Sequence, residues 1–286
     1  MNNARVLFPI TSSDSIIVQI RLEGDQNGSD ITFSDFQGYL NQDAMVDSNK
    51  INLETATRVD QATLNSGNLK LVGKISKDKI ENNNENLLSK KKFWFAASTH
   101  EGEEKILLEA HLEIKKKFSE ILTIIAPRHI NRSDDIKKLC DKFQIKSQIL
   151  EKNDLIDSEK EVIIINSFGV LSKYFKYAKS VFIGKSLVKS LHQNSGQNPI
   201  DAAKLGCKIY HGPYVYNFQE IYGMLAQNKI SQLVNNSKEL TIKLLFDFKN
   251  FAYEKKNNSS FLDILGQQTL DNNMKSINNF LFNENN

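Results

Sequence analysis

Cysteine, proline and tryptophan are scarce in this 286-residue chain, which has two, four and one of them, respectively. The two cysteines, Cys140 and Cys207, stand far apart, with no metal-site spacing and no catalytic signature around them. We interpret both as buried or half-buried thiols in a reducing compartment. So few cysteines exclude a small protein that is held together by disulfides. Neither sign of charge dominates, because 37 Lys and Arg against 34 Asp and Glu leave a net charge of +3. That balance does not indicate a nucleic-acid partner, and we expect none.

Long hydrophobic runs are also missing, because no stretch approaches the roughly 18 consecutive apolar residues of a membrane span. The first 20 residues lack a basic region followed by a continuous apolar one, so no signal peptide is recognisable and we expect a cytoplasmic chain. With 40% hydrophobic and 25% charged residues, the composition is typical of a folded globular protein rather than a disordered or collagen-like one. At about 150 residues per domain, the length predicts two domains.

Motifs of the common metal and hydrolytic sites are absent from the sequence. The five histidines are scattered, and neither HExxH nor CxxC occurs, so we expect no metal ion. The chain has no GxSxG, no Walker lysine loop and no GxGxxG, which disfavours the usual hydrolases and P-loop enzymes. Lysine runs at 90–92 and 115–117 are interpreted as solvated faces, with contact to an anionic bilayer as the alternative.

From Lys92 onward, short apolar runs alternate with longer amphipathic ones, as in a parallel sheet with crossover helices. The predicted strands are 93–98, 121–127, 147–150, 161–166, 180–184, 208–212 and 230–234. Helices are predicted over about 101–118, from near Ser133, over 170–177, from about Pro199, from Asn217, and from Ser237 to a frayed Asn-rich tail. This pattern predicts an α/β fold, a doubly wound domain whose parallel sheet carries helices on both faces.

The first 90 residues differ from the rest of the chain. They are rich in Asn, Asp, Ser and Gln, with weak periodicity and scattered strand-like pieces such as SIIVQIRL. The segment NNNEN at 82–86, followed by SKKK, is predicted as a linker or exposed loop. Only one complete domain is therefore visible, and the front end is too short and too polar to supply a second.

The densest cluster of polar side chains is STHEGEE at 98–104, where a predicted strand ends and a helix begins. In open α/β sheets, ligands bind outside the carboxyl ends of the strands, near the free N–H groups of helix N-termini. Ser98 or Thr99 can cap the helix and the glutamates complement its dipole, so capping alone is one explanation of the segment. Capping leaves His100 and Gly102 unexplained, and the glycine permits the close backbone approach that a bound sugar or phosphate requires.

Three further turns follow later strands of the predicted sheet. Arg128, in PRH at 127–129, can bind a phosphate or carboxylate through two hydrogen bonds, with a solvated loop arginine as the alternative. In SGQNPID at 195–201, Asp201 can accept two hydrogen bonds from a ribose diol, although first-turn carboxylates are common without any ligand. His211 is interpreted as a hydrogen-bonded structural histidine.

Taken in order, these turns resemble the C-terminal half of the 3-deoxy-D-manno-octulosonic acid (Kdo) transferases, bacterial glycosyltransferases of lipopolysaccharide synthesis. The resemblance covers about residues 66–235, and the agreement of the segments in order and spacing makes it specific. The matching segments are SGNLK at 66–70, AASTHEGEE at 96–104, APRH at 126–129, SFGVL at 167–171, FIGKSLV at 182–188, GQNPIDAAKLG at 196–206 and HGPYVYNFQEIY at 211–222.

The resemblance implies a GT-B architecture, in which two Rossmann-like domains enclose the active site and the C-terminal one binds CMP-Kdo. It implies no metal ion and no cofactor besides this donor substrate. Lys70 matches a family lysine that stabilises the transition state. The substrate-binding residues that the resemblance implies are Pro127, Arg128 and His129 for nucleotide and phosphate, Phe168, Gly169 and Val170 for cytidine, Asn198, Pro199, Ile200 and Asp201 for ribose and phosphate, and Ser98, Thr99, His100 and Glu101 for the sugar.

The chain also departs from the family pattern. The family's last motif has Glu-Pro where this chain has Asp201 and Ala202, and the loop before it is stretched. The family's N-terminal domain, with its membrane anchor, acceptor site and glutamate general base, has no counterpart, so the chain resembles an N-terminally truncated member. We therefore predict a remnant of the acceptor domain and linker over residues 1–75, and the CMP-Kdo-binding domain with C-terminal helices over residues 76–286.

The reaction implied is transfer of Kdo from CMP-Kdo to a lipid A precursor, impaired here because the general base is absent. The expected partners are CMP-Kdo, the lipid A precursor and, peripherally, the inner membrane. We expect the chain at the cytoplasmic face of the bacterial inner membrane or, as a truncated chain, in the cytoplasm. Two alternatives stay open: a non-catalytic nucleotide-binding remnant or subunit whose other half is a separate chain, and a GT-B enzyme for another nucleotide sugar.

Overall fold

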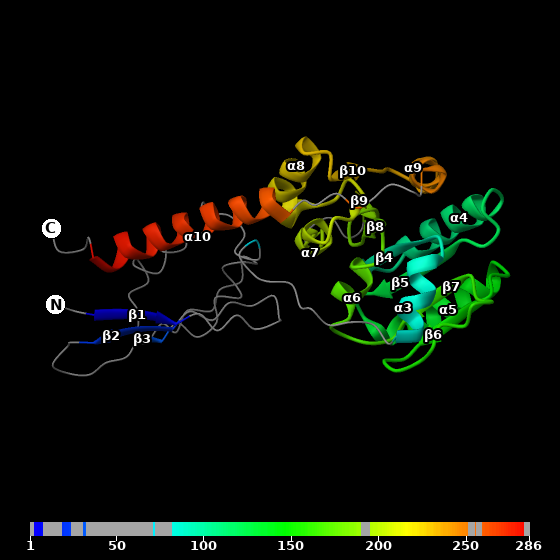
Figure 1. Cartoon of the computed structure of the whole chain (residues 1–286), viewed down its shortest axis with the longest axis horizontal. Helices are drawn as coiled ribbons and strands as arrows, with labels where there is room; N and C mark the ends of the chain where they lie inside the picture. Colours follow the sequence, from blue (N-terminus) through cyan, green and yellow to red (C-terminus); the bar gives the residue numbers. More distant parts are fainter. Residues whose placement is uncertain are drawn as a thin grey trace. The chain divides into compact units, whose positions relative to one another are not determined.

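The computed structural model describes residues 3–7, 19–23, 31–32, 71, 82–189, 195–250, 255 and 259–282. The chain divides into two compact units, residues 1–74 with 260–286, and residues 75–259. The first unit contains an antiparallel sheet in the order β1-β2-β3 and nearly all of a long helix, α10 (Figure 1). The bounds are β1 (Asn3–Leu7), β2 (Gln19–Glu23), β3 (Ile31–Thr32) and α10 (Ser259–Phe282).

The second unit is built on a parallel sheet in the order β10-β9-β8-β4-β5-β7-β6 (Figure 1). Its strands are β4 (Phe93–Thr99), β5 (Leu122–Pro127), β6 (Ser147–Leu150), β7 (Val162–Ile165), β8 (Ser180–Ile183), β9 (Lys208–His211) and β10 (Ser231–Leu233). The direction of winding reverses at β4, because β5 lies on one side of it and β8 on the other.

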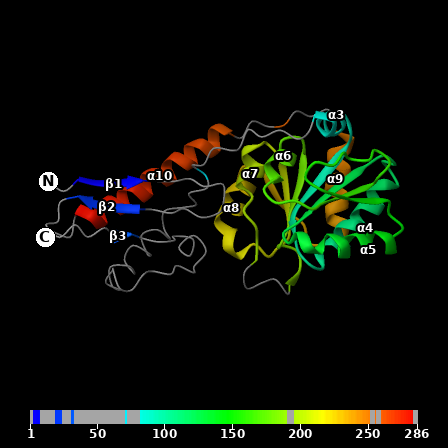
Figure 2. The same ribbon diagram turned by 90° about the horizontal axis from the view of Figure 1, so that it is seen from below.

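Helices cover both faces of this sheet (Figure 2). Helices α4, α5 and α9 lie on one face, and α6, α7 and α8 lie on the other. The bounds are α3 (Asn82–Lys90), α4 (Glu103–Lys115), η2 (Ile130–Arg132), α5 (Ser133–Lys142), α6 (Leu171–Phe175), α7 (Ile200–Lys204), η4 (Tyr216–Phe218), α8 (Gln219–Gln227) and α9 (Ser237–Lys249). The predicted α/β fold with a parallel sheet and two helical layers is confirmed.

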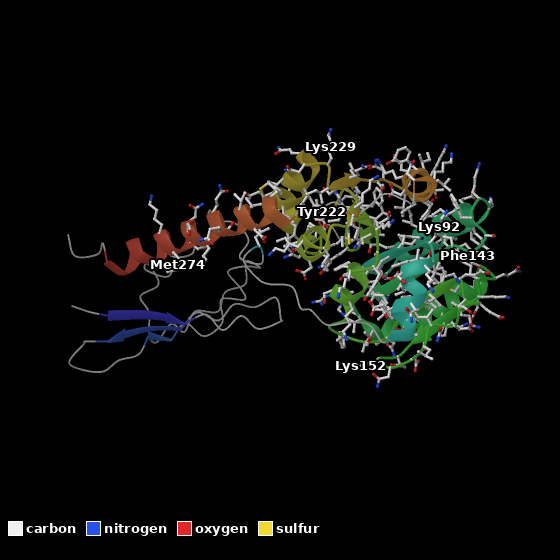
Figure 3. All side chains as sticks on the ribbon, viewed as in Figure 1. Lys92, Phe143, Lys152, Tyr222, Lys229 and Met274 are labelled. Atoms are coloured by element: carbon white, nitrogen blue, oxygen red, sulfur yellow. The ribbon has the colours of Figure 1, made fainter. Side chains whose placement is uncertain are left out.

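The central strands are buried along their whole length. Every residue of β4 and of β7 is buried, because a parallel sheet covered on both faces leaves neither side of a strand in water. Trp94 of β4 and Tyr210 of β9 are fully buried in the cluster that joins the sheet to α4 and α9. On the other face Tyr222, on α8 (Figure 3), is 2% exposed and its ring centroid lies 4.2 Å from that of His211.

The predicted strands from residue 93 onward are confirmed, with ends that shift by a residue or two. Apolar runs of four to seven residues are a clear signal for such strands, since both faces must be apolar. The helix predicted from Asn217 is also present, although it begins as the 3-10 turn η4 and becomes regular at Gln219.

The predicted loop over residues 82–86 is wrong, because these residues form the first half of α3. Asn84 is 4% exposed, and its amide group holds the backbone of a distant turn. Its Nδ2 donates to the carbonyl of Asp154 at 2.8 Å, and its Oδ1 accepts from the N–H of Ile156 at 2.8 Å. Leu88, one turn later, is 2% exposed. These tertiary contacts outweigh the weak helix propensity of an Asn-rich segment.

The two cysteines are free and buried, as the sequence predicts, and the reducing compartment stays a prediction. Burial raises the pKa of the Cys140 thiol to about 11, and that of the Cys207 thiol to about 11, so both are uncharged at neutral pH. Among the described residues, no helix has the length and apolar character needed to cross a bilayer.

Candidate functional site

The reversal of strand order places a candidate site at the carboxyl ends of β4 and β8. In doubly wound sheets, ligands bind where neighbouring strands connect to opposite sides. The segments that follow β4, β5, β7, β8 and β9 all reach this edge of the sheet, because the strands are parallel. Each of these segments carries residues that the sequence singled out.

The segment after β4 leaves the sheet through an irregular turn. The register with β5 shifts between Ala97 and Thr99, and Ser98 has φ 55°, a left-handed value that is uncommon outside glycine. The carbonyl of Ser98 lies 3.0 Å from Nδ1 of His100, which fixes the imidazole ring. The N-cap of α4 is Gly102, with φ 91° and no side-chain cap. The predicted capping by Ser98 or Thr99 is therefore wrong, because the turn carries the chain past both before the helix starts.

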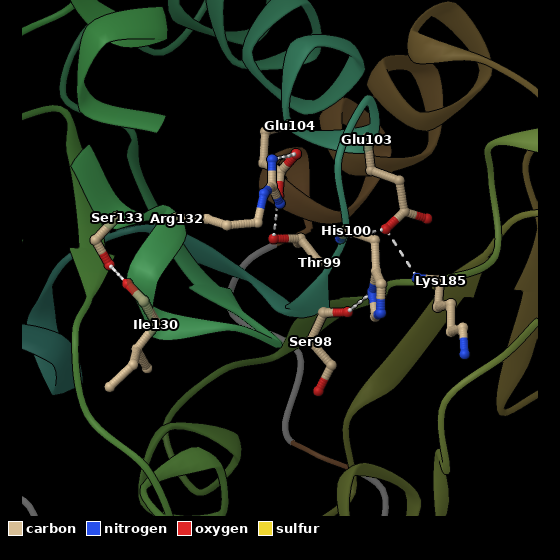
Figure 4. Close-up of polar contacts among 9 residues, drawn as sticks. All are labelled: Ser98, Thr99, His100, Glu103, Glu104, Ile130, Arg132, Ser133 and Lys185. Atoms are coloured by element: carbon tan, nitrogen blue, oxygen red, sulfur yellow. Dashed lines mark hydrogen bonds and ion pairs between the residues drawn. The ribbon is translucent and has the colours of Figure 1, made fainter. Parts of the chain in front are cut away.

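Glu103 holds two of these segments together (Figure 4). It is fully buried, and its carboxylate accepts four backbone N–H groups. One comes from His100 at 2.9 Å, and three come from Lys185, Ser186 and Leu187 at 2.8, 2.8 and 3.0 Å. Burial raises the pKa of Glu103, and the four N–H donors oppose this shift because they favour the ionised form. One carboxylate thus joins the turn after β4 to the turn after β8.

Glu104, the next residue, binds side chains near the ends of β4 and β5 rather than the turn after β8. Its carboxylate pairs with both terminal nitrogens of Arg132 at 2.6 and 3.2 Å and accepts the hydroxyl of Thr99 at 2.9 Å (Figure 4). The backbone N–H of Arg128 donates to the carbonyl of Thr99 at 3.0 Å. These bonds tie the turn after β5 to the end of β4. Glu103 and Glu104 were predicted only to complement a helix dipole, and nothing in their local sequence reveals their distant partners.

The exposed side chains at this edge include the carboxylate of Glu101, the guanidinium of Arg128 and the ring of His129. Arg128 and His129 are exposed, and the ring centroids of His129 and His100 lie 5.7 Å apart. Burial, together with the nearby charges of Lys185, His129 and Arg128, lowers the pKa of His100 to about 4, although the hydrogen bond that the ring donates to the carbonyl of Ser98 opposes this shift. His100 is therefore neutral at pH 7 and acts as a hydrogen-bonding group rather than a charge.

The turn after β7 presents an aromatic ring. Phe168 is 69% exposed, Gly169 has φ 73°, and Val170 is buried at the start of α6. An exposed ring at a ligand-binding edge can stack on a base.

The segment 195–201 is attached to the turn after β8. The N–H of Gly196 donates to the carbonyl of Lys185 at 2.6 Å. Asn198 uses its Oδ1 to accept the N–H of Ile200 at 3.0 Å, which closes the turn before α7. Pro199 and Ile200 are buried, and Asp201 is half-buried in the first turn of that helix.

Two glycines allow the strand ends to touch. A Cβ on Gly184 would lie 2.4 Å from the carbonyl oxygen of Ser98, and one on Gly212 would lie 2.0 Å from that of Ser186. No side chain fits either position. His211, beside Gly212, is buried and its Nδ1 lies 2.8 Å from the carbonyl of Gly212, in keeping with the predicted structural role.

The structure thus brings most of the predicted site residues to one edge of one sheet. Ser98, His100, Glu101, Arg128 and His129 lie at the ends of β4 and β5. Thr99 is fully buried and Pro127 is buried, so these two support the edge rather than present side chains to solvent. Lys70 lies outside the described residues. Among the residues that the structure describes, no group of three or more His, Cys, Asp or Glu side chains is placed to hold a metal ion.

Comparison with known proteins gives a partial match. No protein-family model matches the chain. It is 31% identical over 134 residues to 3-deoxy-D-manno-octulosonic acid transferase from Haemophilus influenzae, a match that covers 47% of this chain and 30% of that protein. It is 30% identical over 155 residues to the transferase of the same name from Aquifex aeolicus, covering 54% of this chain and 41% of that protein. The matches span less than half the length of these relatives.

A solved structure shares the fold. The C-terminal CMP-Kdo binding domain of WaaA from Acinetobacter baumannii superposes with a TM-score of 0.53 and 18% sequence identity, over 75% of this chain and 98% of that domain. Over about half of its length, the chain is thus similar in sequence to the 3-deoxy-D-manno-octulosonic acid transferases, and it has the α/β fold that this resemblance implies.

Proposed function

We propose that the parallel-sheet unit is the donor-binding part of a glycosyltransferase of lipopolysaccharide synthesis, and that its donor is CMP-Kdo. The observation that carries this proposal is the meeting of His100, Arg128 and His129 at the switch point between β4 and β8. This position suits an anionic nucleotide, because it combines positive charge with the carboxyl ends of parallel strands. The sequence similarity to Kdo transferases selects CMP-Kdo among such ligands.

The proposed reaction transfers Kdo to a hydroxyl of a lipid A precursor. The acceptor oxygen forms a bond to the anomeric carbon of Kdo, the bond from that carbon to the phosphate oxygen breaks, and the electron pair leaves with CMP. Arg128 would stabilise the charge that develops on the departing phosphate. Lys70 would do the same by family resemblance, and the acceptor's proton goes to a base that we do not assign. The acceptor and the location at the cytoplasmic face of the inner membrane are part of this proposal.

The neutral state of His100 fits a role beside the sugar. Its Nδ1 is engaged by the carbonyl of Ser98, so its Nε2 is the nitrogen left to accept a hydrogen bond. A neutral ring there would orient a donor hydroxyl without adding charge. Phe168 would stack on the cytosine, and Asp201 would accept hydrogen bonds from the ribose.

Titration calorimetry with CMP, UDP and GDP tests this proposal. We expect the chain to bind CMP and to bind UDP and GDP far more weakly. Arg128→Ala should weaken CMP binding at least about tenfold, because a charge-assisted contact to phosphate is lost. Lys138→Ala removes one positive charge from an exposed position on α5 and should leave CMP binding unchanged. Binding of UDP or GDP without CMP would instead indicate a different nucleotide sugar.

A further inference from the structure

Lys185 lies in the turn that follows β8, on one side of β4, and Arg128 follows β5, on the other side. The backbone of Lys185 has φ 56°, a left-handed value that a residue with a side chain seldom adopts. Two bonds hold it there: its N–H donates to Oε2 of Glu103 at 2.8 Å, and its carbonyl accepts the N–H of Gly196 at 2.6 Å. The surrounding structure therefore imposes the conformation and sets the direction of the side chain.

That direction is toward the candidate site. The same oxygen of Glu103 accepts the N–H of His100 at 2.9 Å, so one atom fixes the backbones of both residues. Figure 4 shows the side chains of His100 and Lys185 extending the same way, away from the carboxylate of Glu103. Lys185 and His100 thus border one region at the carboxyl end of β4.

The ammonium of Lys185 has no anionic partner within the described structure. It is half-buried, and no hydrogen bond or ion pair joins its Nζ to a described residue. Burial lowers the pKa of Lys185, and the positive charge of Arg128 lowers it further. A partly buried cation that faces a second cation is unfavourable unless an anion lies between them.

We propose that Lys185 is a second cationic binding residue, which acts together with Arg128 on an oxyanion of the ligand. This inference rests on the proposed function and deepens it, because the donor CMP-Kdo carries two oxyanions, its phosphate and the carboxylate of its sugar acid. Either group would neutralise the pair of cations. Glu103 then acts as the positioning residue that keeps Lys185 facing the site.

Lys185→Gly is the sharpest variant, because glycine adopts φ near +56° without strain and the turn is preserved. Lys229→Gly is its matched control: Lys229 is exposed, has φ 59° and follows the end of α8. Lys185→Arg retains the charge and tests for rescue.

Calorimetry with cytidine, CMP and CMP-Kdo distinguishes the two oxyanions. If Lys185 binds the phosphate, Lys185→Gly lowers the affinity for CMP and for CMP-Kdo about tenfold and leaves the affinity for cytidine unchanged. If Lys185 binds the carboxylate, only the affinity for CMP-Kdo falls. In both cases Lys185→Arg recovers most of the affinity and Lys229→Gly matches the wild-type chain. Unchanged affinity for CMP and CMP-Kdo, or an equal loss for cytidine, would overturn the inference.

The proposed function can be refuted separately from the role of Lys185. If the wild-type chain binds UDP rather than CMP, the assignment of CMP-Kdo is wrong, and the role of Lys185 still stands if Lys185→Gly weakens UDP about tenfold. If the wild-type chain binds none of these nucleotides and no inorganic pyrophosphate, both the function and the anion site are refuted.

Discussion

Glu103 and Glu104 are adjacent buried carboxylates with different tasks. Glu103 accepts only backbone N–H groups, whereas Glu104 pairs with Arg132 and Thr99. Each is stable inside the protein because its charge is matched by several donors. Successive residues at the start of a helix point in different directions, which is why two neighbours can hold two different turns.

His111, on α4, is a buried histidine away from the candidate site. It is fully buried, and its Nδ1 lies 2.8 Å from Oγ1 of Thr123. Its Nε2 lies 3.7 Å from Oε2 of Glu161, whose other oxygen pairs with Lys115 at 2.8 Å. Burial lowers the pKa of His111 to about 4, although the charge of Glu161 opposes this shift.

This low pKa predicts a loss of stability in acid. His111 takes up a proton near pH 6.5 in the unfolded chain but only near pH 4 in the folded one, so its contribution is complete above pH 6.5 and is lost as the pH falls toward 4. At about 1.4 kcal/mol per pH unit, the free energy of unfolding should fall by about 2 to 3 kcal/mol from this group between pH 6.5 and 4.5. Urea unfolding across this range measures the slope.

His111→Gln should flatten that slope, since it removes the titrating ring. Gln227→Ala is the control, because Gln227 is exposed, carries no titrating group and should leave the slope as it is in the unmodified chain. An identical pH profile in His111→Gln and the unmodified protein would contradict the explanation.

Among the elements, α3 shows how tertiary contacts override local composition. Its sequence NNNENLLSK has the polar, Asn-rich character of a loop, yet it forms a regular helix. Leu88 is buried, and Asn84 binds both the carbonyl of Asp154 and the N–H of Ile156. The side chain of Gln148, on β6, also holds this turn, because its Nε2 donates to the carbonyl of Leu155 at 2.9 Å. α3 and β6 therefore fix the turn at 154–156 together.

Asn84→Ala should therefore destabilise the fold by about 2 kcal/mol, because the buried N–H of Ile156 and the partly buried carbonyl of Asp154 lose their partner. Asn86→Ala changes an exposed asparagine of the same helix and should stay within about 0.5 kcal/mol of the unmodified protein. Chemical denaturation of the two variants measures the difference. Equal stability of the two would show that the amide of Asn84 contributes little.

For the molecule as a whole, the position of the charges matters more than their sum. The net charge is only +3, but Arg128 and Lys185 stand close enough for one to lower the pKa of the other. Both belong to turns that are held by hydrogen bonds to the β4–α4 region, at the point where the sheet reverses its winding. The fold thus concentrates positive charge that the composition does not reveal.

A local charge pair predicts a salt-dependent affinity. Raising NaCl from 50 to 500 mM should weaken CMP binding several-fold, because the Debye length falls below about 10 Å and the two cations are screened. The double variant Arg128→Ala with Lys185→Gly should bind CMP weakly at both salt concentrations and show a smaller change between them. Calorimetry at the two concentrations tests this, and a CMP affinity that does not depend on salt would argue against a charge-based site.

The sequence by itself determined the strands of the second unit and the residues at the ends of these strands. Apolar runs such as VIII at 162–165 identify strands that are buried on both faces, because burial and side-chain period leave a local signal. The polar turns after them, including PRH at 127–129, were recognisable because each one directly follows an apolar run. The order of these segments was enough to detect the resemblance to Kdo transferases.

Only the tertiary structure decided which of these turns meet. β8 lies beside β4 although β5, β6 and β7 come between them in the chain, and this pairing brings Lys185 to Glu103 and opposite Arg128. The left-handed backbone of Lys185, three of the four partners of Glu103 and the helical state of α3 depend on contacts between residues more than 65 positions apart. The local sequence indicates which residues are buried and at what spacing the buried positions recur. It does not indicate which distant group will lie against each of them.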